Sequence, residues 1–216
     1  DVVASDDEVF IFDLSSFLVR DAHQVSLRLH AREEGEWALD PERSVLETHA
    51  SLSFPDNLEF EATLSFGTSE PGDGSGSTSP SPTTLSFRQH HSFVRPPDEG
   101  YTPRLASPRM GNMSVGRLDF AVPLEQPLEQ SLAIRHRLQA EAPLIYYVDP
   151  GAPPLIRKAL IEGASWWAEA FEQAGHKGGF EVRVLPDGAH PLDVRYNVIN
   201  WVHRSTRGWS YGASVV

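Results

Sequence analysis

The most regular pattern of hydrophobic and polar positions in this chain lies between residues 154 and 174 and predicts an amphipathic helix. Its apolar residues recur at steps of three and four: Leu155, Ile156, Ala159, Leu160, Gly163, Trp167, Ala170 and Phe171. Pro153 and Pro154 mark the start, because proline fits the first helical turn, where its missing N–H is no loss. Gly175 follows the last periodic residue, where a left-handed cap is expected.

Short apolar runs on both sides of this helix predict β-strands. They cover residues 144–148, 180–185 and 194–202, and the turn signal Asp149-Pro150-Gly151 closes the first run. The order strand, helix, strand, strand predicts the opening of an α/β layer.

The first part of the chain has the patterns of a β-rich, mostly antiparallel domain. Strands are predicted over residues 8–14, 25–30, 59–66, 85–94 and 131–138, and a helix or loop is expected to begin near Asp40-Pro41. In the two central strands, one face carries Phe60, Ala62, Leu64 and Phe66, and the other strand places Leu85, Phe87, Gln89, His91 and Phe93 together. We expect these two strands to pair as an antiparallel hairpin.

Two segments divide the chain. Residues 68–83 are rich in Gly, Ser and Pro and predict a flexible loop between the paired strands. Glu141-Ala142-Pro143 marks a boundary between a β-rich domain over residues 1–141 and an α/β portion over residues 142–216. The predicted fold class is therefore α+β.

Composition narrows the possible functions. The formal net charge of −12 disfavours a nucleic-acid partner, because phosphate binding needs basic patches. No stretch approaches the roughly 18 uninterrupted apolar residues that predict a membrane helix. The chain has no cysteine, which excludes disulfides, thiolate catalysis and cysteine-ligated zinc.

Several long motifs resemble one family. They include Tyr146-Tyr147-Val148-Asp149, Glu162-Gly163-Ala164-Ser165-Trp166-Trp167, Asp193-Val194-Arg195-Tyr196-Asn197-Val198-Ile199, and the run from Trp201 to Gly212. With these motifs, residues 143–216 resemble the first part of the catalytic domain of a large bacterial family of zinc-dependent metalloproteases, metzincin-like in type. Leu39-Asp40-Pro41-Glu42-Arg43-Ser44 and Gly100-Tyr101-Thr102-Pro103-Arg104 resemble the domain that precedes the protease unit.

One departure from the family is decisive for activity. The zinc motif of the family, HExxH with a third ligand downstream, is absent from the sequence. The resemblance implies zinc in the intact protein, with ligands beyond Val216 and none bound by this chain. We therefore expect an excerpt or cleavage product of an endopeptidase that is inactive alone. Its implied partners are a polypeptide substrate and the remaining C-terminal part of the catalytic domain, and its implied location is extracytoplasmic, periplasmic or secreted.

The segment from Thr206 to Gly212 places aromatic residues between glycines just before a predicted strand. In metzincin-like proteases an edge strand beside the zinc binds the substrate backbone as an added strand. The resemblance therefore implies that Trp209, Tyr211 and Gly212 enter or border the substrate cleft. The structural alternative is that these aromatic residues cap the end of the sheet in the core.

Nine histidines raise the possibility of a metal site. His91 and His136 fall on apolar strand faces, where two facing histidines joined by a carboxylate could bind zinc, whereas His90 points the other way. The alternative for each is a hydrogen-bonded structural histidine, and for His203 a structural role competes with titration near a cleft. Asp149 and Asp193 flank turns, which favours turn formation over a role as general base.

A function of another class is also compatible with the sequence. A non-catalytic β-domain could bind a protein or glycan partner through its aromatic and Gly-rich loops. The incomplete α/β unit argues against this alternative, because so apolar a helix needs a complete sheet beneath it.

Overall fold

The computed structural model describes residues 2–5, 9–71, 83–96, 100–138 and 142–203. These residues form an α+β, β-rich fold, which packs as two units, Asp1–Arg95 and Pro96–Val216. Each unit is described below by itself.

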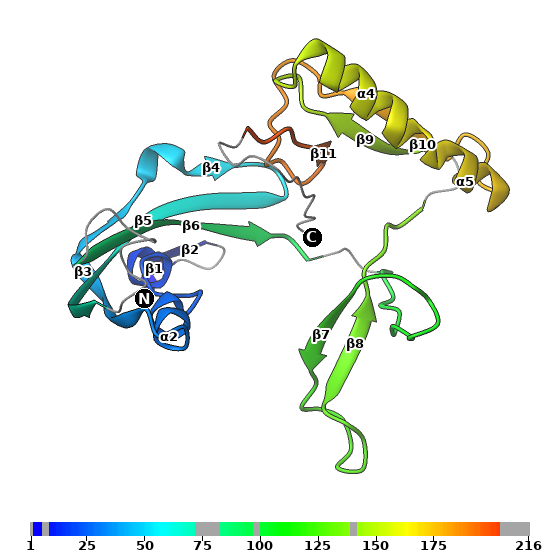
Figure 1. Cartoon of the computed structure of the whole chain (residues 1–216). Helices are drawn as coiled ribbons and strands as arrows, with labels where there is room; N and C mark the ends of the chain where they lie inside the picture. The colour runs from blue at the N-terminus through cyan, green and yellow to red at the C-terminus, as the bar shows by residue number, and fades with distance from the viewer. Residues whose placement is uncertain (1, 6–8, 72–82, 97–99, 139–141, 204–216) are drawn as a thin grey trace. The chain divides into compact units, whose positions relative to one another are not determined.

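Unit 1 is built around an antiparallel sheet with the order β3-β5-β4, in which β6 also pairs with β5 (Figure 1). Its strands are β3 (Gly35–Leu46), β4 (Leu52–Ser53), β5 (Asn57–Pro71) and β6 (Thr84–Val94), and the 3-10 helix η1 (Thr48–Ala50) precedes β4. The predicted hairpin between β5 and β6 is confirmed, with Ala62 opposite Gln89 and Phe66 opposite Leu85. Strand β5 continues to Pro71, so residues 68–71 of the predicted loop are strand, and residues 72–82 lie outside the described residues.

The core of unit 1 lies on one face of this sheet. Its fully buried members are Leu29, Trp37, Ala62, Leu64, Phe66 and Leu85. The predicted alternation along β5 and β6 is confirmed for these positions, because residues two apart on a strand face the same side. Two short helices, α1 (Ser15–Leu18) and α2 (Val25–His30), contribute Leu18 and Leu29 to buried positions.

The prediction of a strand over residues 25–30 was wrong, because the segment is helix α2. Its alternation fits a strand, but the Asp21 carboxylate accepts the N–H groups of Val25 at 2.8 Å and Ser26 at 3.1 Å, which caps the first turn. Leu29 then faces the core while Leu27 stays 59 % exposed, as the helical period requires.

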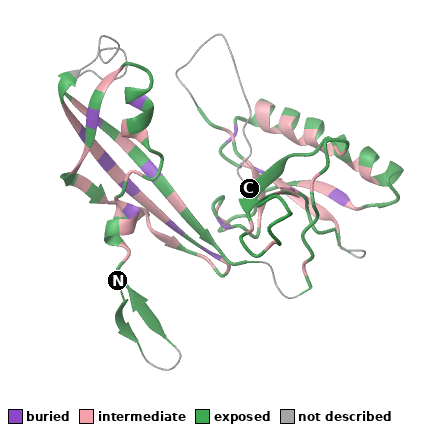
Figure 2. Ribbon diagram, turned by 90° about the horizontal axis from the view of Figure 1, so that it is seen from below, coloured by how far each residue is buried: buried purple, intermediate pink, exposed green. Residues whose placement is uncertain are grey.

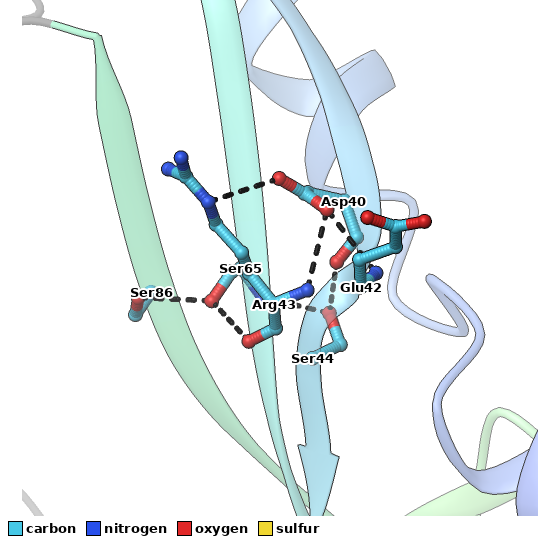
Figure 3. Close-up of polar contacts among 6 residues, drawn as sticks. All are labelled: Asp40, Glu42, Arg43, Ser44, Ser65 and Ser86. Carbon is cyan, nitrogen blue, oxygen red and sulfur yellow. Dashed lines mark hydrogen bonds and ion pairs between the residues drawn. The ribbon is translucent and has the colours of Figure 1, made fainter.

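The prediction that a helix or loop begins near Asp40 was also wrong, because this segment is a wide bulge within β3 (Figure 3). Asp40 lies opposite Ser65, and the next paired residue is Val45, opposite Thr63. Inside the bulge, the Asp40 carboxylate accepts the N–H of Glu42 at 3.1 Å, and Ser44 Oγ donates to the Asp40 carbonyl at 2.7 Å. Polar side chains thus replace the ladder hydrogen bonds that the bulge removes.

At the N-terminus, β1 (Val2–Ser5) and β2 (Phe10–Phe12) form a separate two-stranded hairpin that is exposed along its described length (Figure 2). The strand predicted over residues 8–14 is therefore present in shortened form.

Unit 2 contains an antiparallel hairpin of β7 (Ser114–Leu118) and β8 (Glu129–Ala133). The strand predicted over residues 131–138 thus ends at Ala133, and His136 lies outside it. Strand β7 was not predicted, because its sequence has no strong alternation of apolar residues. All five of its residues are exposed.

The second part of unit 2 is a three-stranded parallel sheet in the order β10-β9-β11. Its strands are β9 (Leu144–Val148), β10 (Phe180–Val184) and β11 (Asn197–Ile199). Helices α4 (Pro154–Ser165) and α5 (Trp167–Gln173) connect β9 to β10 and run along these strands (Figure 1). The predicted order of strand, helix, strand, strand is confirmed, although β11 is shorter than the predicted strand over residues 194–202.

The predicted helix start and cap are confirmed. Pro154 occupies the first turn of α4, and Gly175 has a φ of 91°. Gly175 N–H donates to the Glu172 carbonyl at 3.0 Å and His176 N–H to the Phe171 carbonyl at 2.8 Å, the two bonds of a Schellman cap.

The single predicted helix over residues 154–174 is interrupted at Trp166. Ser165 Oγ donates to the Ile161 carbonyl at 2.6 Å, a side-chain bond to the preceding turn that bends helices. The predicted apolar face also divides in two: Ile156, Leu160 and Phe171 are partly buried, whereas Leu155 is 84 % and Trp167 62 % exposed.

Candidate functional site

The predicted cleft residues Trp209, Tyr211 and Gly212 lie outside the described residues, which end at residue 203. The last described elements before them in the sequence are β11 and the segment from Trp201 to His203. Within the described part of unit 2, β11 has a strand partner on one side only, β9.

The carboxyl ends of β9, β10 and β11 meet at one edge of the sheet, because the strands are parallel. In parallel α/β sheets, ligands bind in the crevice outside this edge. Asp149 follows β9 there: its Oδ1 accepts the Gly151 N–H at 2.8 Å, and its Oδ2 accepts the Trp201 N–H at 3.3 Å. The Asp149 N–H donates to the Ile199 carbonyl at 3.0 Å. Asp149 thus forms the turn and ties it to the chain that follows β11.

Asp193 lies in the loop before β11 and is only 3 % exposed. Arg195 donates to both of its oxygens, from Nε to Oδ1 at 2.9 Å and from Nη2 to Oδ2 at 2.6 Å. The hydrogen bonds from Arg195 hold the pKa of Asp193 below its usual value, against the opposing effect of burial. A carboxylate whose oxygens are both engaged by a guanidinium is a structural ion pair and a poor general base.

Aromatic side chains and an amide secure the same strands. Tyr147 and Tyr196 meet edge to face with ring centroids 5.2 Å apart, and Asn197 Nδ2 donates to the Ile145 carbonyl at 2.9 Å. In the described residues, the indole N–H of Trp201 is a buried donor without a hydrogen-bond partner.

His136 contacts β9 through Tyr146. Its Nε2 lies 2.7 Å from the Tyr146 hydroxyl, and the two rings meet edge to face at 5.6 Å. Burial lowers the pKa of His136 and raises the pKa of Tyr146. Both shifts favour the neutral forms of the two groups, which share one hydrogen bond.

His90 and His91 occupy opposite faces of β6, as predicted. His91 lies on the core face, where its Nε2 is 2.8 Å from Gln89 Nε2 and its ring is 5.7 Å from Phe17. Burial lowers the pKa of His91. His91 belongs to unit 1 and His136 to unit 2, and among the described residues no group of three or more His, Cys, Asp or Glu side chains could hold a metal ion.

A buried acid that sequence reasoning missed lies on the other face of β5. Glu59 is 2 % exposed, accepts a hydrogen bond from Ser92 Oγ at 2.7 Å, and lies 2.5 Å from His90 Nε2. The signal in the sequence was indirect: alternation along β5 and β6 places Glu59, Glu61, His90 and Ser92 on one polar face, but it predicts that face to be solvated.

Together these contacts define an α+β protein whose described carboxylates and histidines mainly hold strands and turns in place. The chain belongs to the family described as Domain of unknown function (DUF5117), which matches residues 1–141. Comparisons with curated proteins and with solved structures gave no match. No helix among the described residues is long and apolar enough to span a membrane.

The family match ends at residue 141, whereas packing divides the chain after Arg95. The domain boundary between residues 141 and 142 stays a prediction.

Proposed function

We propose that residues 142–216 form the first part of a metzincin-like zinc-dependent endopeptidase domain, and that residues 1–141 form the β-rich domain that accompanies it. The observation that carries this proposal is the parallel unit of β9, α4, α5 and β10, with β11 on the other side of β9. The resemblance to the protease family implies a unit that begins with strand, helix and strand. Two of its motifs lie on these elements: Tyr146-Tyr147-Val148 on β9 and the run from Glu162 to Trp167 on α4 and the start of α5.

The chemistry of such a site needs groups that this chain does not supply. Zinc would polarise the scissile carbonyl and lower the pKa of a bound water, and the glutamate of an HExxH motif would accept the proton. The sequence contains no such motif. In this proposal the ligands come from further sequence, and the chain alone hydrolyses no peptide bond.

The role proposed for residues 142–216 is to build one wall of the cleft. Trp209, Tyr211 and Gly212 follow β11 in the sequence, and an extended substrate binds to a sheet by pairing with an edge strand. Substitution of Gly212 by valine in the intact protein is expected to raise KM more than it lowers kcat, because it obstructs backbone approach and leaves zinc untouched.

The outer face of α4 and α5 also supports the proposal. Trp166 and Trp167, at the junction of the two helices, are 74 % and 62 % exposed, and Leu155 at the start of α4 is 84 % exposed. We infer that these exposed apolar side chains contact further protein. The remainder of a catalytic domain is the occupant that the resemblance implies.

Peptide mapping of the gene product from its native source tests the proposal. We expect a mass above 23.9 kDa and a peptide with the sequence His-Glu-x-x-His downstream of Val216. A gene product without that motif would remove the basis for a zinc peptidase. Cell fractionation of the same source tests the extracytoplasmic location, which rests on the resemblance alone.

A further inference from the structure

The hairpin of β1 and β2, called the N-terminal arm below, exposes apolar side chains on both of its faces (Figure 2). Phe10 and Phe12 lie on one face with ring centroids 6.2 Å apart, and Ile11 lies on the other, because successive side chains of a strand alternate. All three side chains are more than half exposed. A two-stranded hairpin by itself is at best marginally stable in water, so the arm needs a further surface to pack on.

A matching apolar surface lies at one end of the sheet of unit 1. This uncovered sheet end consists of Phe17, Leu58, Phe60 and Phe93. Leu58 lies opposite Phe93 in the register of β5 and β6, and the Phe93 ring is 5.9 Å from that of Phe17 and 5.8 Å from that of Phe60. Leu58 is 41 % and Phe93 36 % exposed, whereas Ala62, further along the same face of β5, is fully buried. The face that carries the core is therefore open at this end.

The charges of the two surfaces are complementary. The Arg20 guanidinium lies 4.0 Å from the centroid of the Phe17 ring, at the border of the uncovered sheet end. Arg20 is exposed and, among the described residues, has no carboxylate partner. The first 14 residues of the chain contain five Asp or Glu and no Lys, Arg or His. The arm thus combines apolar strands with the negative charge that this arginine lacks.

The receiving surface also fits a strand. Within the part of unit 1 that the structure describes, β6 has a strand partner on one side only, β5. The other edge of β6 offers unpaired backbone N–H and C=O groups, and extended segments add to such edges. Phe93 lies on this edge strand, so the apolar surface and the free edge are adjacent.

We propose that the N-terminal arm of one copy of this chain packs on the uncovered sheet end of a second copy, and that the two copies exchange their arms reciprocally. Phe10 and Phe12 of the arm cover Leu58 and Phe93, and the acidic groups beside the strands face Arg20. Exchange of an identical element is a low-cost route to a dimer. The proposal concerns unit 1 alone and is independent of the proposed protease function.

Analytical ultracentrifugation of the tag-free 216-residue chain over roughly 1–300 µM covers the range of weak interfaces. We expect the mass to rise with concentration from 23.9 kDa toward twice that value. Because the net charge of −12 makes the copies repel, the measurement is made at about 0.15 M salt, where charges are screened beyond roughly 8 Å. A chain that stays monomeric over the whole range would overturn the proposal.

Substitutions on both surfaces identify the contact. Phe10→Asp on the arm and Leu58→Asp on the sheet end should each weaken dimerisation about 10-fold or more, because each puts a charge into an apolar contact. Phe120→Asp and Leu128→Asp make the same changes at exposed positions of unit 2 and should leave it unchanged. Arg20→Glu changes an exposed position of the sheet end without touching its core, and should weaken dimerisation by about 3–10-fold.

Mixing the variants separates arm exchange from other modes of association. The Phe10→Asp chain keeps an intact sheet end and the Leu58→Asp chain keeps an intact arm, so the two should associate with each other when neither dimerises alone. Circular dichroism and the melting temperature check that both are folded. Dimerisation that Phe10→Asp abolishes but that neither Leu58→Asp nor Arg20→Glu weakens would mean that arms bind arms, and would overturn the proposal.

Discussion

The carboxylate of Asp193 stays ionised inside the protein because Arg195 donates hydrogen bonds to both of its oxygens. Removing one member of such a pair leaves the other without its partner, which makes the substitution more costly than the pair itself is stabilising. The contribution to stability is present above the usual aspartate pKa of 3.8 and is lost as the pH falls through the lowered folded-state pKa.

Asp193→Asn should lower the free energy of unfolding of unit 2 by about 1–2 kcal/mol, because a charged hydrogen-bonded pair is lost and the half-exposed Arg195 is partly screened by solvent. Urea unfolding measures this change. Asp187→Asn, an exposed residue in the preceding turn, is the matched control and should change stability by less than about 0.5 kcal/mol. Equal effects of both substitutions would show that the ion pair contributes nothing.

His136 and His91 make stability depend on pH in the opposite direction from a salt-bridged histidine. Burial lowers the pKa of both, so the folded state binds fewer protons than the unfolded state below pH 6.5. Their contribution is present above pH 6.5 and is lost as the pH falls through the folded-state pKa values. The melting temperature should therefore drop between pH 6.5 and 5, and His136→Phe should reduce that drop. A melting temperature that rises over this range would contradict the assignment.

At the scale of elements, the predictions that were confirmed rest on features of the local sequence. Strand β9 and the Schellman cap at Gly175 were predictable, because an apolar run between turn residues and a glycine after a helix are local features. Helix α2 was not predictable, because the alternation of its apolar and polar residues fits a strand. Only the capping hydrogen bond to the Asp21 carboxylate favours the helix. The buried charge of Glu59 was not predictable either, since pairing with His90 and Ser92 depends on contacts more than 30 residues apart in sequence.

Helices α4 and α5 expose one apolar face and bury the other, and this division is testable. Phe171 stacks on Phe180 with centroids 5.1 Å apart, so Phe171→Ala should destabilise unit 2 by about 2 kcal/mol, less than a fully buried phenylalanine costs. Trp166, 74 % exposed, is the matched control, and Trp166→Ser should stay within about 0.5 kcal/mol in the 216-residue chain. A larger loss for Trp166→Ser would mean that this face is covered in solution.

At the scale of the whole molecule, the chain joins a DUF5117 match over residues 1–141 to a parallel strand-helix-strand unit. The two units differ in kind. The antiparallel sheet of unit 1 has its own core, including Trp37, Ala62 and Phe66. Among the described residues, the parallel sheet of unit 2 has three strands and helices with exposed apolar side chains, and parallel sheets are normally covered on both faces. This difference is compatible with the proposal that residues 142–216 form the first part of a larger catalytic domain.

Peptide hydrolysis by the intact gene product tests that claim most directly. The protein from its native source is incubated with a denatured protein substrate before chelation, after removal of metal, and after zinc is returned. The account predicts hydrolysis that chelation abolishes and zinc restores, while the 216-residue chain stays inactive in all three conditions. Hydrolysis that survives complete metal removal, or an intact product that remains inactive with zinc bound, would contradict it.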